Sequence, residues 1–245
     1  MVHYMICIKD LNLLCSRAEL DNLPEGKLLI NTINAFSYNN ARRDVLFEDA
    51  LTKGDVLIPD GISIVRVCRF LKGKSRPKER IAGWDLFVYE MRKLNEKGGK
   101  VMFLGSSEKV LALIRQRAAK VYPNLEVVTY SPPYKPQFTI EDDQNMIQAI
   151  NEANPDLLWI GMTAPKQEKW AYANWDRLNI HCHVGTIGAV FDFFAGTYKR
   201  APMVWQKFGF EWLYRLLKEP RRMWKRYIIG NIEFLSLVVR EKFGF

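Results

Sequence analysis

Short apolar runs alternate with longer amphipathic stretches along most of the chain. The runs are rich in branched residues and bounded by Gly, Pro or Asp, which is typical of buried strands. The longer stretches carry apolar residues three or four positions apart, which predicts helices. A weaker strand candidate at residues 4–8 is set aside. The predicted strands cover residues 27–32, 55–59, 100–105, 125–130, 156–161 and 181–185, and the predicted helices cover residues 36–53, 84–97, 107–122, 141–154 and 166–178.

This alternation predicts an α/β fold. Strands that alternate with helices pair in parallel through right-handed crossovers, so we expect a Rossmann-like, doubly wound, mostly parallel sheet. From about Pro202 the pattern is helical only, with helices expected over residues 205–219 and 220–243. We therefore expect an α/β domain over residues 1–198 and a C-terminal helical, basic appendage over residues 199–245.

The strand ends carry most of the candidate site residues. In an open parallel sheet, ligands bind beyond the carboxyl ends of the strands. Five of the predicted strands are followed by small or polar residues, which we expect to face one crevice. These residues are Thr32 and Asn34, Asp60, Gly105 and Ser106, Gly161 to Gln167, and Gly185 to Gly188.

Asp60 follows a predicted strand and lies between Pro59 and Gly61 in the stretch LIPDGISIV. An aspartate in this setting is usually a turn residue that accepts hydrogen bonds from the neighbouring backbone. Its place at a strand end supports a second interpretation, in which the carboxylate takes a proton from a bound hydroxyl and Gly61 allows close approach. Turn geometry and catalysis are compatible, because the turn can hold the carboxylate in position.

Two other strand ends are candidate phosphate sites. In GMTAPKQEKW, residues 161–170, Lys166 and Gln167 fall near a helix N-terminus, where backbone donors and the helix dipole favour an anion. A solvated first turn explains that segment equally well. FLGSSEKV, residues 103–110, joins a strand to a helix through small residues but has neither the GxGxxG nor the GxxxxGK(S/T) pattern. The usual dinucleotide and ATP fingerprints are therefore missing there.

Patterns for metal binding are weak. His181 and His183 would lie on one side of a strand, but no third ligand follows at a suitable spacing. The sequence also lacks an Asp-x-Asp pair, a common arrangement for holding Mg²⁺ on the diphosphate of a sugar nucleotide. We expect no metal and no cofactor, so another group must neutralise any diphosphate.

Most of the net charge of +9 lies in the predicted appendage. Residues 199–245 contain eleven Lys or Arg and four Glu, which gives +7. Such a segment attracts the phosphates of nucleic acid, anionic lipid or a nucleotide. Arg215, Lys218, Arg222 and Arg226 recur at three- and four-residue spacing and could pair with phosphates, although solvated surface charge is the ordinary interpretation. The amphipathic last helix suits packing on the sheet or binding at a membrane surface.

Seven segments, taken in order, resemble the WecG/TagA/CpsF family of bacterial glycosyltransferases between about Leu29 and Arg226. The resemblance implies transfer of N-acetylmannosamine, its uronate or a related hexose from a UDP-sugar to a polyprenyl-diphosphate-linked sugar. It also implies inversion at the anomeric carbon without a metal. The expected setting is surface polysaccharide or teichoic acid synthesis at the inner face of the cell membrane. The segments are NTINAFSYNNAR, LIPDGISIV, ERIAGWDLF, VMFLGSSEKV, DLLWIGMTAPKQEKW, GAVFDFFAGTYKRAP and FEWLYRLLKEPRRMWKRY.

The resemblance also implies roles for individual residues. Asp60 matches the family's proposed general base. Arg215 and Arg222 match arginines near the diphosphate, in an appendage that closes over the site and promotes membrane association. The matching pocket residues are Thr32, Asn34, Arg80 and Gln167, the matching nucleotide positions are Gly105, Gly185 and Asp192, and the strand-end rule adds Gly161 and Lys166 as substrate-binding candidates.

The chain departs from the family pattern in places that bear on the donor sugar. Gly161-Met162-Thr163 stands where the family usually has Gly-x-Gly. The stretch from Gly185 to Asp192 is one residue longer than in TagA-like members, and the segment before Leu29 is short and divergent. The resemblance therefore leaves the donor, the acceptor sugar and the oligomeric state open, with a homo-oligomer among the alternatives.

Two other functions fit parts of the sequence. A nucleic-acid-binding protein would use the basic tail, but the α/β domain is nearly neutral and carries no RNA- or DNA-binding motif, so we expect no nucleic acid partner. A sugar-nucleotide-binding protein without catalysis would keep the crevice without needing Asp60 as a base. Four scattered cysteines and an N-terminus without a secretory pattern predict a cytoplasmic protein with reduced thiols.

Overall fold

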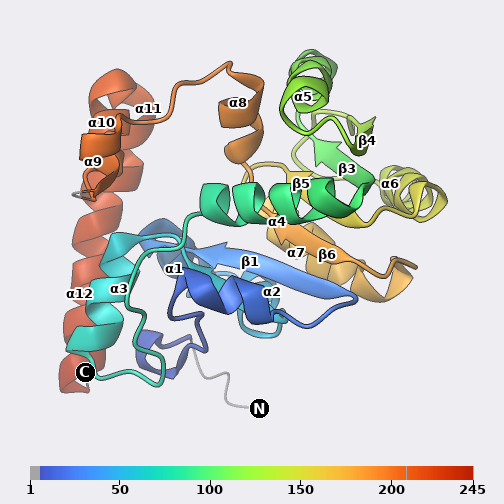
Figure 1. Ribbon diagram of the computed structural model, residues 1–245. Coiled ribbons are helices and arrows are strands. Elements are labelled where there is room, and N and C mark those ends of the chain that lie inside the picture. The colour runs from blue at the N-terminus through green and yellow to red at the C-terminus, as the bar shows by residue number, and fades with distance from the viewer. Residues whose placement is uncertain (1–5, 208, 245) are drawn as a thin grey trace.

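A six-stranded sheet lies between two layers of helices (Figure 1). The computed structural model describes residues 6–207 and 209–244. All strands run parallel, in the order β2-β1-β6-β5-β3-β4. The predicted α/β class, with a parallel sheet and C-terminal helices, is thereby confirmed. The strands are β1 (Leu28–Ile33), β2 (Val56–Pro59), β3 (Gly99–Gly105), β4 (Leu125–Tyr130), β5 (Leu157–Gly161) and β6 (His183–Thr186).

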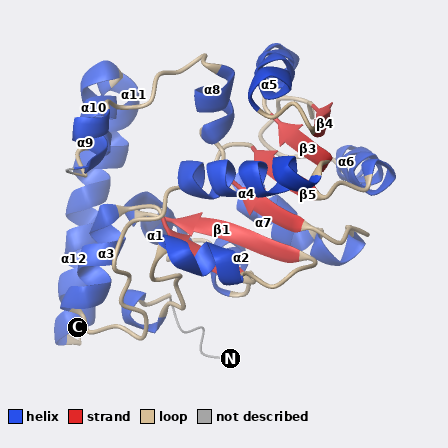
Figure 2. Cartoon of the chain, viewed as in Figure 1, coloured by secondary structure: helices blue, strands red, loops and turns tan. Residues whose placement is uncertain are grey.

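Successive residues of each strand face opposite layers, which gives the sheet two apolar faces. Phe103 and Trp159 pack with α4 (Gly83–Lys97), α5 (Glu108–Val121) and α8 (Val190–Ala195) on one face. Their chain neighbours Met102 and Leu158 pack with α6 (Ile140–Ala153) and α7 (Lys166–Ala173) on the other. Figure 2 shows the sheet in red between these helices. The predicted strands and the helices of residues 84–97, 107–122 and 141–154 agree with this arrangement to within a few residues.

The prediction of one continuous helix over residues 36–53 is wrong. The chain forms α1 (Ala35–Ala41) and α2 (Val45–Thr52) instead. Asp44 has an extended backbone, and its side chain accepts a hydrogen bond from the N–H of Phe47 at 3.1 Å, which begins a new helix. The apolar spacing passes through this break, so periodicity alone misses it.

Other elements also differ from the expectation. The helix predicted over residues 166–178 ends at Ala173 and is followed by a 3₁₀ turn. Helix α3 (Ile62–Phe70), directly after Asp60, was not predicted. Of the weak strand candidate, residues 4 and 5 lie outside the described residues, and Ile6 to Ile8 form no strand.

The helix predicted over residues 205–219 is broken at Gly209, which has φ 77° and separates α9 (Met203–Lys207) from α10 (Glu211–Lys218). The helix predicted over residues 220–243 is confirmed. It runs through α11 (Pro220–Trp224), a π-helical turn (Lys225–Ile229) and α12 (Gly230–Phe243). No helix in the described part of the chain is both long and apolar enough to cross a membrane. The predicted boundary between the α/β domain and the appendage, at residue 198, stays a prediction.

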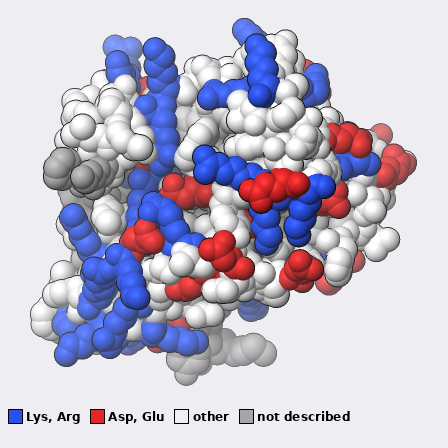
Figure 3. Space-filling view, viewed as in Figure 1, with Lys and Arg blue, Asp and Glu red and all other residues white. Residues whose placement is uncertain are grey.

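Basic side chains are not confined to the C-terminal helices. Residues 66–78 hold six Lys or Arg and no acidic residue, a cluster that the whole-domain charge had concealed. All six are exposed, in α3 and the loop that follows. Lys242 of α12 lies 5.0 Å above the Phe70 ring of α3, so the two basic segments adjoin. Figure 3 shows Lys and Arg gathered over this end of the molecule.

Gly185 of β6 leaves room for the ring of Trp159, its register partner in β5. A Cβ atom at Gly185 would lie 2.2 Å from that ring, so the buried tryptophan must shift if a methyl group is added. We expect Gly185→Ala to lower the free energy of unfolding by about 1–3 kcal/mol, measured by urea denaturation.

Gly230→Ala is the matched control, because its Cβ would lie 3.8 Å from the nearest atom in a continuous helix. This substitution should be neutral or stabilise by up to about 1 kcal/mol. Equal effects of the two substitutions would show that the Trp159 contact does not limit position 185.

Candidate active site

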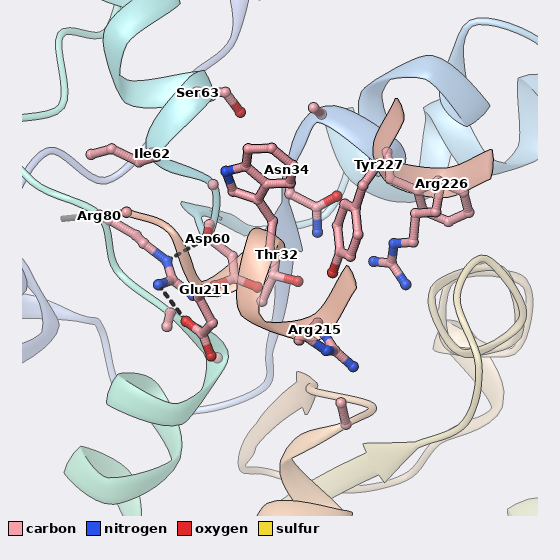
Figure 4. Close-up of a pocket in the computed structure, with 18 of the residues that line it drawn as sticks. Thr32, Asn34, Asp60, Ile62, Ser63, Arg80, Glu211, Arg215, Arg226 and Tyr227 are labelled. Carbon is pink, nitrogen blue, oxygen red and sulfur yellow. Dashed lines mark hydrogen bonds and ion pairs between the residues drawn. The ribbon is translucent and has the colours of Figure 1, made fainter. Parts of the chain in front are cut away.

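A cavity of about 570 Å³ lies over the carboxyl ends of β1 and β2, beneath the C-terminal helices. Figure 4 shows its labelled lining residues converging from these separate parts of the chain. Thr32 and Asn34 come from the end of β1, and Asp60 comes from the end of β2. Arg215 of α10 and Arg226 of the π-helical turn close the cavity from the other side. The ends of β1 and β2 and the loop after β6 meet the C-terminal helices here, whereas the ends of β3 and β5 contribute no lining residue to this cavity.

Contacts with the end of β1 hold the backbone around Asp60 in place. Its N–H donates to the carbonyl of Ile33 at 2.9 Å, which ties it to the end of β1. A Cβ atom on Gly61 would lie 3.1 Å from Cβ of Asn34, so glycine lets the two strand-end loops touch. Asn34 in turn caps α1 by accepting a hydrogen bond from the N–H of Ser37 at 3.1 Å. The turn geometry thus holds the Asp60 side chain at the cavity, where 27 % of it is exposed.

Arg80 binds Asp60 through both backbone and side chain. Its Nε donates to the Asp60 carbonyl at 2.6 Å and its Nη2 donates to Oδ1 at 3.0 Å. Its Nη1 donates to Oε2 of Glu211 at 2.7 Å, and Arg200 donates to the other Glu211 oxygen at 3.3 Å. The N–H of Ile81 donates to the carbonyl of Pro59, which keeps Arg80 beside the end of β2.

Burial governs the ionisation of this group. It raises the pKa of Asp60, an effect that Arg80 opposes and the nearby negative charge of Glu211 reinforces. Burial also acts to raise the pKa of Glu211, but Arg80 and Arg200 outweigh it and the net shift is downward. Arg80 keeps its proton, because its two carboxylate partners outweigh its burial and raise its pKa. A carboxylate with a raised pKa is suited to accept a proton near neutral pH.

Arg215 and Arg226 form a cationic wall without carboxylate partners. The Nε atoms of both are buried, and no hydrogen bond or ion pair joins either guanidinium to a described residue. Arg226 lies 4.3 Å from the centre of the Phe36 ring. Burial lowers its pKa, and the charge of Arg215 adds to the effect. Two unpaired guanidinium groups in one cavity can receive an anion with several oxygen acceptors.

The remaining predicted residues lie outside this cavity's lining. Arg222 is exposed and pairs with Glu219 at 2.5 Å. Lys166 donates to the carbonyl of Lys135 at 2.6 Å and lies over the Phe138 ring. Asp192 accepts a hydrogen bond from Thr197 at 3.1 Å. The catalytic role of Arg222 and the substrate-binding roles of Lys166 and Asp192 stay predictions.

Gly105, Gly161, Gln167 and Gly185 lie at the neighbouring ends of β3, β5 and β6. A Cβ atom on Gly105 would lie 2.4 Å from the carbonyl oxygen of Gly161, so these two strand ends pack closely. Oε1 of Gln167 accepts from the N–H groups of Met162 and Gly188, each at 3.1 Å. Gln167 therefore ties the β5 end to the loop after β6, and that loop continues to Ala189 in the cavity wall.

The histidine pair has a structural explanation. Nδ1 of His183 lies 2.9 Å from Oε1 of Glu90, and Nε2 lies 2.9 Å from the carbonyl oxygen of Pro24. His183 begins β6, at the end of the sheet opposite the cavity, and His181 precedes the strand. Within residues 6–207 and 209–244, no three His, Cys, Asp or Glu side chains are grouped as a metal site would require.

Sequence reasoning missed Glu211 and Arg200 as site residues and gave Arg226 no role of its own. Glu211 and Arg215 are four residues apart and therefore share one face of α10, which was a usable signal. Nothing in the local pattern indicates that this face turns toward Asp60. The long-range placement of α10 over β2 is what brings them together.

Comparison with known proteins gives a family match over most of the chain. Residues 12–245 match the model of the Glycosyl transferase WecG/TagA/CpsF family. The chain belongs to this family. It is a glycosyltransferase.

Two curated relatives are similar over most of their length. One, from Bacillus spizizenii, is 31 % identical over 220 residues, covering 89 % of this chain and 82 % of the relative. The other, from Bacillus subtilis, is 30 % identical over 214 residues, covering 87 % and 80 %. Both carry the name N-acetylglucosaminyldiphosphoundecaprenol N-acetyl-beta-D-mannosaminyltransferase.

Glu168, next to Gln167 in this glycosyltransferase, is a buried carboxyl with 2 % exposure. Its Oε1 accepts a hydrogen bond from Gln167 at 2.8 Å, whereas its Oε2 has no partner among the described residues. Burial raises its pKa from 4.5 to about 7. The folded protein therefore binds this proton more tightly than the unfolded chain does.

Because of Glu168, the free energy of unfolding should fall as the pH rises from 4.5 to about 7. Its contribution is complete below pH 4.5 and is lost as the pH passes about 7, at about 1.4 kcal/mol per pH unit. Glu168→Gln cannot ionise, so its stability relative to wild type should increase between pH 5 and 7 and level off above. Urea denaturation across this range measures the difference.

Glu152→Gln, on the exposed face of α6, is the control and should leave the pH dependence unchanged. A Glu168→Gln curve parallel to that of wild type would contradict the assignment of a buried proton to Glu168.

Proposed function

We propose that this glycosyltransferase moves N-acetylmannosamine, or a closely related hexose, from a UDP-sugar to a polyprenyl-diphosphate-linked sugar. The names of both relatives support an acceptor that carries N-acetylglucosamine on undecaprenyl diphosphate. The expected setting is synthesis of a surface polysaccharide or teichoic acid. The observation that carries the proposal is the cavity that holds Asp60 opposite the unpaired Arg215 and Arg226.

In this proposal Asp60 acts as the general base. The acceptor hydroxyl gives its proton to the carboxylate as its oxygen bonds to the anomeric carbon of the donor sugar. The bond between that carbon and the UDP oxygen breaks on the opposite face, so the configuration inverts. Thr32 and Asn34 lie beside Asp60 and are placed to bind hydroxyl groups of the sugars.

The leaving diphosphate gains negative charge as this bond breaks. Arg215 and Arg226 supply fixed positive charge at the cavity, which stabilises the developing charge without reorganisation. The proposal keeps the expectation that no metal is required. Arg222 joins this set only when Glu219 releases it.

The nucleotide is expected at the adjacent strand ends. Gly105, Gly161 and Gly185 let these strand ends pack closely against neighbouring backbone and aromatic rings, and Gln167 fixes the loop that leads into the cavity. Lys166 and Asp192 border the same region at the beginnings of α7 and α8. Binding of uridine beside the β3, β5 and β6 ends would direct the diphosphate toward the two arginines.

The C-terminal helices are proposed to bind the membrane that carries the acceptor. A row of apolar side chains on one face is between 45 % and 67 % exposed. The basic cluster of residues 66–78 and Lys242 adjoin that face. Apolar and basic side chains in this arrangement suit a surface of anionic lipid. The row consists of Ile228, Ile229, Ile232, Leu235, Val239 and Phe243.

The assay combines a short-chain polyprenyl-diphosphate N-acetylglucosamine acceptor with a panel of UDP-hexosamines, UDP-uronates and UDP-hexoses. Transfer should occur with one of these donors. UDP release and product mass provide the readout. Asp60→Asn should reduce kcat by about 10²–10⁴-fold, because it removes the base. It should retain UDP affinity, measured by calorimetry.

A sugar-nucleotide-binding protein without catalysis would bind UDP and give no product with any donor. Product formed by Asp60→Asn at the wild-type rate would exclude Asp60 as the base.

Membrane binding should depend on the apolar row. Ile232→Ser with Val239→Ser removes two side chains that are 66 % and 51 % exposed. We expect this double variant to lose most binding to vesicles containing anionic lipid in a flotation assay. Turnover on the long-chain acceptor should fall with it, whereas turnover on a water-soluble acceptor persists.

Val45→Ser is the control, since Val45 is 55 % exposed on α2 and is not part of the apolar row. Deletion from about Pro202 should remove both vesicle binding and transfer. A deletion variant with full activity on the lipid acceptor would refute the coupling.

A further inference from the structure

Four charged side chains form a closed group at one end of the cavity. Asp60 follows β2, Arg80 precedes α4, Arg200 lies between α8 and α9, and Glu211 begins α10. Glu211 is bound by Arg80 through Oε2 and by Arg200 through Oε1. Only 13 % of its side chain is exposed, less than for the other three. The group joins the loop after β2 and the α3–α4 loop to the appendage, with Glu211 bound by both arginines.

Glu211 limits how Arg80 binds Asp60. A free guanidinium commonly grips both oxygens of a carboxylate through two parallel hydrogen bonds. Here Nε of Arg80 is taken by the Asp60 carbonyl and Nη1 by Glu211, so only Nη2 reaches the Asp60 carboxylate. No described residue donates to Oδ2 of Asp60. That oxygen stays available to a hydroxyl in the cavity.

The charges around Asp60 come from several elements. Arg80 and Arg200 favour its ionised form, and Arg226 of the π-helical turn is close enough to feel its charge. Arg66 of α3 and Arg215 of α10 also line the cavity. Glu211 supplies the opposing negative charge and therefore acts to keep Asp60 a stronger base.

The contact exists only where the segment that leads into α10 packs on the first turn of α3. Gly209, just before α10, is packed so closely that a Cβ atom there would lie 2.9 Å from Cγ2 of Ile62 in the first turn of α3. Glu211 begins the helix two residues later. Moving this segment off Ile62 would take Glu211 away and leave Nη1 of Arg80 free to turn onto Asp60.

We propose that Glu211 is a positioning residue for the transfer reaction, which holds Arg80 by one nitrogen so that Asp60 keeps one carboxylate oxygen for the acceptor hydroxyl. The role rests on the proposed function, in which Asp60 is the base. In this role the appendage must be in place for the acceptor hydroxyl to reach Asp60, as well as for the arginines to face the diphosphate.

Glu211→Gln tests this role, because it keeps the shape of the side chain and removes its charge. A ¹³C NMR titration of labelled aspartate carboxyls, with Asp60 assigned from its absence in Asp60→Asn, should show a lower pKa for Asp60 in the variant. The acid limb of the kcat/KM profile should move to lower pH in parallel. We expect kcat to fall by about 10–100-fold, with the donor KM little changed.

Two further variants separate positioning from a structural effect. Glu233→Gln breaks the ion pair between α12 and Arg43, away from Asp60, and should leave the titration and the pH profile unchanged. Glu211→Asp retains the charge with a shorter reach and should return the titration toward the wild-type position.

An identical Asp60 titration and acid limb in wild type and Glu211→Gln would overturn the inference. If wild type transferred no sugar, the proposed function would fail, and the NMR titration would still decide the effect of Glu211 on Asp60.

Discussion

The packing of the last helix against α1 sets the place of Arg226 in the cavity. Tyr38 of α1 is fully buried, and its ring meets Phe234 of α12 edge-on at 5.7 Å. Its hydroxyl donates to Glu241 at 3.1 Å, and the same carboxylate accepts from the N–H groups of Ile8 and Lys9. Because helical structure is continuous from residue 220 to residue 243, holding its far end sets the position of Arg226. Arg226 thus depends on a contact at the opposite end of the helix.

The fold was largely predictable from the sequence because its signals are local. Each strand is a short apolar run with residues such as Phe103 and Met102 buried on opposite faces, and such runs are visible without tertiary information. The breaks at Asp44 and Gly209 were missed for a physical reason. A side-chain cap and a left-handed glycine end a helix without changing the apolar spacing.

The site was predictable only in part. Asp60, Thr32 and Asn34 could be placed together because the carboxyl ends of parallel strands share one edge of the sheet. Arg80 and Arg215 came from the family resemblance and do line the cavity. Glu211 could not be assigned, since its link to Asp60 through Arg80 depends on where the segment before α10 packs on the start of α3. The basic cluster of residues 66–78 was visible in the sequence, but averaging charge over the whole α/β domain concealed it.

The charges of the cavity divide into two parts with different balances. Asp60 and Glu211 are matched by Arg80 and Arg200, so this end carries no net charge when both carboxylates are ionised. Arg215 and Arg226 have no carboxylate partners among the described residues, so the other end is positively charged, and Arg66 adds to the positive charge of the lining. In the proposed reaction the first end would receive the neutral acceptor hydroxyl, and the second would face the diphosphate that gains charge in the transition state. Because Glu211 and both unpaired arginines belong to the appendage, its seating completes the two ends together.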